Sequence, residues 1–217
     1  MLVSHKKKFI YTKTLKTAGT SVEVYFEPYC MPEGEWSFGH ARAEYVSQAG
    51  IIGCRTASTL IIQGATWWNH MPAAVIKKLL GDAIWNSYFK FCTVRNPFDK
   101  LVSAFYYFNP DASRSRHPRQ DFEKWLVAGD LPIDRNKYTI LDEFCMDDVI
   151  RYENLAGDLR RICQKLDVTF QWAELRMLKS EGRPKHPLKD YYSERSIEIV
   201  QRLFRYELEK FGYAAPA

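Results

Sequence analysis

Apolar residues along the chain form short runs, and most of these runs are followed by a helical pattern. Phe9–Tyr11 and Tyr88–Val94 predict buried strands, with Tyr88–Val94 as the central one, and Asp148–Glu153 predicts the last parallel strand. Thr59–Gln63 is a weaker strand candidate. Helical spacing of apolar positions is found near residues 20–26, 72–80, 98–105, 155–166 and 193–211. Strands that alternate with helices predict an α/β fold with a parallel sheet.

Two stretches lack such a pattern. Residues 28–53 have no clean period, and we expect a surface excursion beside the active site. Residues 109–119 are rich in Arg, Ser and Pro and predict a loop or lid, whose arginines are best explained as solvated. A short helix should follow over Phe122–Val127 and end at Gly129. We expect a single domain over residues 1–217, which is long enough for a sizeable core.

Composition narrows the functional classes. The chain is 46% hydrophobic and 15% aromatic, which excludes general disorder. Its net charge of +5 suits an anionic ligand without requiring nucleic acid. The five cysteines are widely spaced and form no zinc pattern, so we expect reduced thiols.

The N-terminal region does not predict a secretory signal. Lys6–Lys8 are basic, but the apolar run that follows covers only Phe9–Tyr11. No stretch approaches the roughly 18 apolar residues of a membrane span. We therefore expect a soluble cytoplasmic protein with no membrane segment.

The most informative stretch follows the first strand. Ala18, Gly19, Thr20 and Ser21 have little side-chain bulk, so backbone N–H groups there can approach a ligand closely. A helix that begins near Gly19 or Thr20 would place unpaired N–H groups and its positive end over this loop. Lys13 and Lys16 add positive charge. The pattern predicts a phosphate cradle, although a plain turn with Thr20 or Ser21 as helix cap is also compatible with it.

This loop is not a Walker A motif, because the lysine precedes the glycine. The order Lys16-Thr17-Ala18-Gly19-Thr20-Ser21 resembles instead the 5′-phosphosulfate loop of sulfotransferases that use 3′-phosphoadenosine 5′-phosphosulfate (PAPS). A second motif, Arg95-Asn96-Pro97 with Ser103 in the next helix, is similar to their 3′-phosphate-binding motif. Arg offers a planar fork of donors to a phosphate, and Ser103 adds a hydroxyl about two turns along the helix.

Weaker similarities cover most of the remaining chain. Tyr152-Glu153-Asn154-Leu155 resembles a signature of the same family, and Asn154 also suits a helix cap. Arg183 and Lys185 resemble the late basic loop that closes over the nucleotide. The resemblance implies a P-loop-like three-layer fold, with a central parallel sheet of four or five strands and helices on both faces.

The resemblance also implies an activity. PAPS would be the donor, 3′-phosphoadenosine 5′-phosphate (PAP) the product, and transfer would go in line to a hydroxyl or amine of a carbohydrate or small metabolite. Lys16 and the N–H groups of residues 17–21 would bind the 5′-phosphosulfate, and Lys16 would stabilise the leaving oxygen. Arg95 and Ser103 would hold the 3′-phosphate. No acidic pair is placed to hold Mg²⁺, so we expect no metal.

The general base has two candidates. His70 precedes the helix that begins near Pro72, where an imidazole tends to stay neutral and able to accept a proton. By position it resembles the base of uronyl 2-O-sulfotransferases, although those enzymes show His-x-His and Trp68 stands at the first position here. Glu23 is the rival, and His70 is favoured because a His is better poised at neutral pH. His40 is a lone loop histidine that we expect to be structural or solvated.

Two other functions remain open from the sequence. A P-loop nucleotide kinase would need a Walker A loop and a strand-end Asp for the metal, and both are missing. A non-catalytic module that binds anionic glycans or nucleotides would keep Lys16 and Arg95 but would have no use for His70. The sequence does not predict the oligomeric state or identify the acceptor.

Overall fold

A computed structural model describes residues 1–56, 63–129, 131–176, 178, 184 and 186–216 of the 217-residue chain. The chain divides into two compact units. The sheet unit consists of Met1–Val94 and Asp134–Leu178, and the helical unit consists of Arg95–Ile133 and Lys179–Ala217. Whether the whole of 1–217 acts as one sulfotransferase-type domain stays a prediction.

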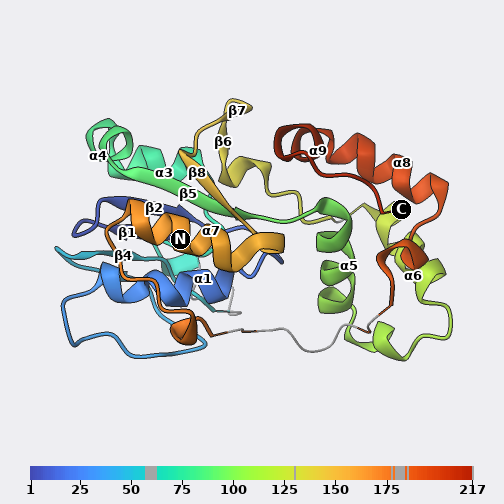
Figure 1. The fold of residues 1–217 in the computed structure, drawn as a ribbon, viewed down its shortest axis with the longest axis horizontal. Coiled ribbons are helices and arrows are strands. Elements are labelled where there is room, and N and C mark those ends of the chain that lie inside the picture. Colours follow the sequence, from blue (N-terminus) through green and yellow to red (C-terminus); the bar gives the residue numbers. More distant parts are fainter. Residues whose placement is uncertain (57–62, 130, 177, 179–183, 185, 217) are drawn as a thin grey trace. The chain divides into compact units, whose positions relative to one another are not determined.

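The sheet unit contains a six-stranded mixed sheet in the order β3-β4-β1-β2-β5-β8 (Figure 1). Its strands are β1 (Leu2–Ser4), β2 (Phe9–Thr12), β3 (Tyr45–Val46), β4 (Gly50–Ile52), β5 (Phe89–Val94) and β8 (Asp148–Arg151). The pairs β2–β5 and β5–β8 are parallel, and the other three pairs are antiparallel. β6 (Thr139–Ile140) and β7 (Glu143–Phe144) form a separate hairpin.

The parallel strands form where the sequence is apolar on both faces. All four residues of β2 are buried, and so are five of the six residues of β5. In the register, Tyr11 lies beside Phe91, and their rings are 5.2 Å apart. Because both faces of these strands are covered, they show continuous apolar runs rather than alternation.

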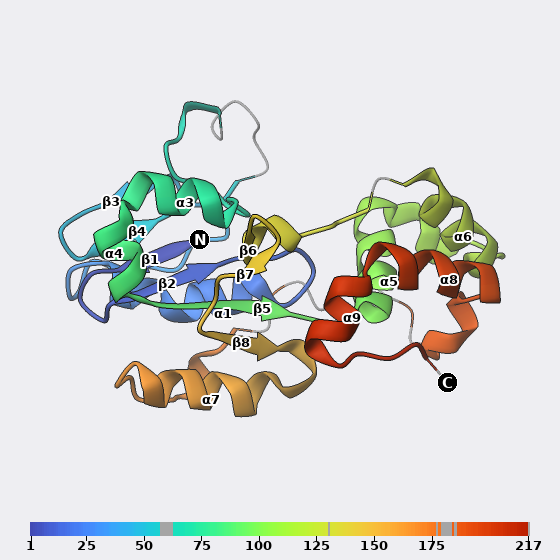
Figure 2. The same cartoon turned by 90° about the horizontal axis from the view of Figure 1, so that it is seen from above.

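Helices cover both faces of the sheet (Figure 2). On one face, α1 (Gly19–Phe26) and α7 (Leu155–Lys165) pack on a core that includes Phe9 and Phe91. On the other face lie α3 (Ala73–Leu80) and α4 (Asp82–Ser87). Short 3-10 turns complete the unit: η1 (Glu27–Cys30), η3 (Arg135–Lys137), η4 (Tyr152–Asn154) and η5 (Trp172–Glu174).

The helical unit has its own core. Its elements are α5 (Pro97–Phe108), η2 (Pro110–Arg114), α6 (Pro118–Ala128), η6 (Leu188–Tyr191), α8 (Glu194–Leu203) and α9 (Arg205–Phe211). Aromatic residues dominate the packing, as in the edge-to-face contact of Phe105 with Phe122 at 5.5 Å. The Asn96 side chain caps α5 by accepting the Phe98 N–H, and Ser193 forms a capping box at α8.

The α/β class with helices on both faces is confirmed, and so are the strands at 9–12, 89–94 and 148–151. The sheet is wider than expected because three short antiparallel strands extend it. Two of these strands, β3 and β4, lie in the region predicted as a surface excursion, where Ile51 and Ile52 are buried. The predicted closing helix ends at Leu203 and restarts at Arg205. The strand candidate at 59–63 falls almost entirely outside the described residues.

Candidate active site

The loop between β2 and α1 has a backbone shape that follows from left-handed residues. Lys16 and Ala18 have φ angles of 60° and 59°. The capping position of α1 is occupied by Ala18, so neither Thr20 nor Ser21 is the cap. The Ala18 side chain makes no capping hydrogen bond. Gly19, Thr20 and Ser21 therefore begin the helix with N–H groups that have no carbonyl partner within it. These donors and the positive end of the helix are the features that favour an anion.

Buried hydroxyl groups hold this loop in place. The Thr14 hydroxyl donates to the Thr93 carbonyl at 2.5 Å, and the Thr17 hydroxyl lies 2.8 Å from that of Thr14 and 2.7 Å from that of Thr93. Thr93 belongs to β5, so the loop is attached to the central strand. A Cβ atom at Gly19 would lie 3.0 Å from the Thr14 carbonyl oxygen, so any other residue here would require the loop to give by a few tenths of an ångström.

Beneath the loop lies a buried ionic cluster that the sequence did not reveal. Glu23 of α1 is fully buried and accepts hydrogen bonds from Lys13 Nζ at 2.7 Å, Arg55 Nη1 at 2.9 Å and the Met1 amino group at 3.0 Å. Against the cost of its burial, these cations hold the pKa of the Glu23 carboxyl well below its usual range. Arg55 also pairs with Glu27, so two carboxylates share its guanidinium.

This cluster corrects one expectation about the loop. The Lys13 side chain is only 3% exposed and points to Glu23, so Lys13 contributes no charge at the loop surface. Lys16 is half-buried and is the lysine of the loop proper. Glu23 is a weak candidate base, because a carboxylate stabilised by three positive groups binds a proton poorly.

His70 lies beside the loop. Its Nδ1 atom is 3.1 Å from the backbone carbonyl oxygen of Lys13. Because a carbonyl only accepts, Nδ1 must carry the proton, and Nε2 keeps its lone pair. Burial, together with the charge of Lys13, lowers the pKa of His70 from 6.5 to about 4, so the imidazole is neutral at pH 7. The expected neutrality is thus supported, with burial rather than a helix end as its leading cause. The lowered pKa also makes the imidazole a weaker base than the near-neutral histidine expected from the sequence.

Asp134 is a site residue that sequence reasoning missed. Its carboxylate is 2% exposed, and Oδ2 accepts the backbone N–H of Leu15 at 2.7 Å. The two residues are 119 positions apart, and no motif connects them, so only the fold brings them together. A negative group therefore contacts the loop one residue before Lys16.

The second motif belongs to the helical unit. Arg95 follows the last residue of β5, and its Nε and Nη2 atoms contact the Asp99 carboxylate at 2.7 and 2.6 Å. Arg95, Asp99 and Ser103 recur every four residues and so lie along one side of α5 and its N-terminus. Ser103 is half-buried. Arg183 and Lys185 lie outside the described residues.

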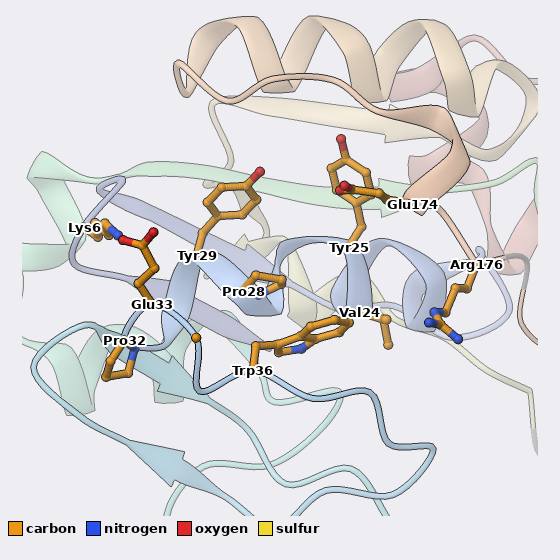
Figure 3. A pocket seen from close by; sticks show the side chains of 11 residues that line it. Lys6, Val24, Tyr25, Pro28, Tyr29, Pro32, Glu33, Trp36, Glu174 and Arg176 are labelled. Carbon is orange, nitrogen blue, oxygen red and sulfur yellow. The ribbon is translucent and has the colours of Figure 1, made fainter.

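A cavity of about 450 Å³ lies on another face of α1 and η1 (Figure 3). Tyr25, Tyr29 and Trp36 line it with aromatic rings, and the indole N–H of Trp36 is bound by Glu27 at 3.0 Å. The charged lining residues are Lys6, Glu33, Glu174 and Arg176, two of each sign. A cavity whose formal charges cancel is unsuited to a polyanion, so we do not assign the phosphates to it.

Within the described part of the chain, no three His, Cys, Asp or Glu side chains are grouped so that they could hold a metal ion. In the same residues, no helix has the length and apolar character needed to cross a membrane. His40 is exposed, and its carbonyl oxygen accepts a hydrogen bond from Arg55 Nε at 3.0 Å.

A family model described as the sulfotransferase family matches residues 1–214. The chain belongs to the sulfotransferase family. No curated protein matches the chain. Family membership makes this protein a transferase with a sulfate donor and an acceptor, and its α/β architecture is consistent with the P-loop-like fold that the motifs predicted.

In the structure, two parts of the predicted site of this sulfotransferase lie next to each other: His70 and the loop that contains Lys16. The sheet unit brings His70 to the loop, with its partner Lys13 three residues before Lys16. The side chains of Thr17 and Ser21 form hydrogen bonds within the protein. The Thr17 hydroxyl lies 2.7 Å from that of Thr93, and the Ser21 hydroxyl accepts the Leu178 N–H at 3.1 Å.

Proposed function

We propose that this sulfotransferase moves the sulfuryl group of PAPS to a hydroxyl or amine of an acceptor, a carbohydrate or a small metabolite. PAPS would supply the activated sulfuryl group and leave as PAP. The observation that carries the proposal is the contact between His70 Nδ1 and the Lys13 carbonyl. It leaves Nε2 unprotonated beside the loop that, in this proposal, binds the anionic donor.

The residues of the loop suit the 5′-phosphosulfate end of PAPS. The N–H groups of Gly19, Thr20 and Ser21 and the positive end of α1 attract an anion without requiring a metal. Gly19 allows the start of α1 to pack closely against the loop, since a side chain there would meet the Thr14 carbonyl and the Lys13 side chain. Lys16 would neutralise the charge that develops on the bridging oxygen when its bond to sulfur breaks.

His70 would act as the general base. Its Nε2 takes the proton of the acceptor hydroxyl, and the Lys13 carbonyl keeps the ring in the required tautomer. Arg95 and Ser103 would hold the 3′-phosphate, the group that distinguishes PAPS from ATP, and Asp99 fixes the guanidinium of Arg95. Arg183 and Lys185 would close over the nucleotide. The cytoplasmic location remains a prediction.

The first experiment tests the donor. We expect PAP to bind in calorimetry without metal, and Arg95→Ala to weaken that binding roughly 10- to 100-fold, the range for losing hydrogen bonds to a charged group. Arg205→Ala is the control, because Arg205 Nε makes the same kind of contact with the Glu209 carboxylate four residues later at 2.7 Å, but on an exposed surface. Metal-dependent ATP binding that equals or exceeds PAP binding would refute the proposal and favour a kinase.

The pH profile tests the state of His70. Because the pKa of His70 is lowered to about 4, the base is already deprotonated well below neutrality. We expect kcat/KM to stay level from pH 7 down to about pH 5 and to fall as the pH approaches 4, where the imidazole gains a proton. An acid limb centred at 6.5 that disappears in His70→Ala would show an exposed, unperturbed histidine and contradict the geometry.

A further inference from the structure

Three consecutive residues of the loop are each held by a different element. Lys13 binds Glu23 of α1 through its side chain and His70 through its carbonyl. The Thr14 hydroxyl binds the β5 carbonyl of Thr93. The Leu15 N–H binds Asp134 Oδ2. Of these contacts, the last one is unusual, because it places a carboxylate against a loop whose other features favour anions.

Holding a backbone N–H does not require a charge. A neutral amide oxygen accepts the same hydrogen bond, and a carboxylate at this point repels the anion that the loop is proposed to bind. Its effect is strengthened by burial, since Asp134 is only 2% exposed and lies in a region of low dielectric. The hydrogen bond to the Leu15 N–H does not by itself account for the negative charge.

The same carboxylate is placed near His70, because Asp134 binds Leu15 and His70 binds Lys13, two residues earlier in the same loop. Asp134 directly precedes η3, and η3 packs against α3, the helix that begins three residues after His70. Four charged groups influence the imidazole: Lys13 and the Met1 amino group lower its pKa, whereas Asp134 and Glu23 raise it. Of the two that raise it, Asp134 contributes more, and Glu23 is already occupied by its three cations.

We propose that Asp134 is a positioning residue with two tasks: it fixes the loop through the Leu15 N–H, and its charge stabilises His70 once the imidazole has taken the proton of the acceptor. The second task rests on the proposed function. In the ground state Asp134 weakens anion binding slightly. When His70 becomes positive, the attraction between the two groups grows, so the carboxylate favours the transition state over the bound donor.

The test is Asp134→Asn, which keeps an oxygen for the Leu15 N–H and removes the charge. We expect PAP to bind as tightly as in wild type or up to about threefold more tightly, because a repulsion is removed, while kcat falls roughly tenfold. In an NMR titration of the histidine ring signals, assigned with His70→Ala, the pKa of His70 should fall below its wild-type value. A merely structural role would weaken PAP binding and turnover together.

Asp147→Asn is the matched control. Asp147 Oδ2 accepts the Lys90 N–H at 2.7 Å, the same backbone contact at the same distance, near the start of β5 rather than at the loop. Unlike Asp134, Asp147 is partly exposed and also pairs with Lys90 Nζ at 2.9 Å. We expect this variant to leave the His70 pKa and kcat unchanged.

The NMR titration separates this proposal from the proposed function, because it requires no sulfuryl transfer. A His70 pKa that falls below its wild-type value in Asp134→Asn would support the pairing even if PAPS were not the donor. An unchanged His70 pKa, or an unchanged kcat in an enzyme shown to use PAPS, would overturn it.

Discussion

Replacing His70 with alanine is expected to lower turnover by about 100-fold or more, the usual scale for loss of a general base. The reason is local: Nε2 is the unprotonated nitrogen beside the loop, because the Lys13 carbonyl holds the proton on Nδ1. Affinity for PAP should remain nearly unchanged, because His70 is assigned to the acceptor proton rather than to the nucleotide. Initial-rate assays of sulfuryl transfer measure the turnover, and calorimetry with PAP measures the nucleotide affinity.

His40→Ala serves as the control, because His40 is an exposed histidine whose described bond is made by its backbone carbonyl. It should retain wild-type turnover. If His70→Ala also retained it, the base would have to be sought elsewhere. Glu23 would then be the next candidate despite its three cation partners, and a non-catalytic binding module would gain support if no variant altered any reaction.

Replacing Lys16 with alanine should impair both donor binding and rate, with a loss of roughly 100- to 1000-fold in kcat, the range for removing one preorganised group that stabilises developing charge. Lys16 stands in the left-handed part of the loop, between Leu15, which Asp134 holds, and Thr17, which Thr93 holds. Its backbone position is therefore fixed from both sides. The measurement is kcat and KM for PAPS together with PAP affinity.

Lys78→Ala is a suitable comparison, since Lys78 is an exposed lysine of α3 and removes the same formal charge. Normal turnover of Lys16→Ala would mean that the assignment of the loop as the phosphosulfate cradle is wrong. An equal loss in both lysine variants would point to the net charge of the protein rather than to the loop.

Strands that are buried on both faces could be predicted, and the shorter edge strands could not. β2 and β5 are apolar along their length, so their sequence alone indicates a strand. β1, β3 and β4 have only two or three residues, too few to show a period, and β1 is followed at once by basic residues. They form strands because their backbones pair in the sheet, β1 with β2 and β4, and β3 with β4.

The backbone of the candidate site was predictable to the extent that it is contiguous in sequence, while the roles of its residues stay predictions. The loop at 16–21 and the helix that starts at Gly19 follow from small residues and spacing, and His70 was identified through its position before α3. The contacts of Lys13 with Glu23 and of Asp134 with Leu15 depend on where side chains of separate elements meet. No local sequence pattern predicts contacts between side chains of separate elements. For this reason the sequence predicts Lys13 at the loop surface and does not indicate Asp134 as a site residue.

The hydroxyl contacts among Thr14, Thr17 and Thr93 bear on how quickly a donor can be captured. All these bonds are made within the chain, so the shape of the loop, including its two left-handed residues, does not depend on a bound molecule. Preorganisation of this kind reduces the entropy lost by the protein when a ligand binds. Association with the loop should then be limited by diffusional encounter rather than by a slow rearrangement.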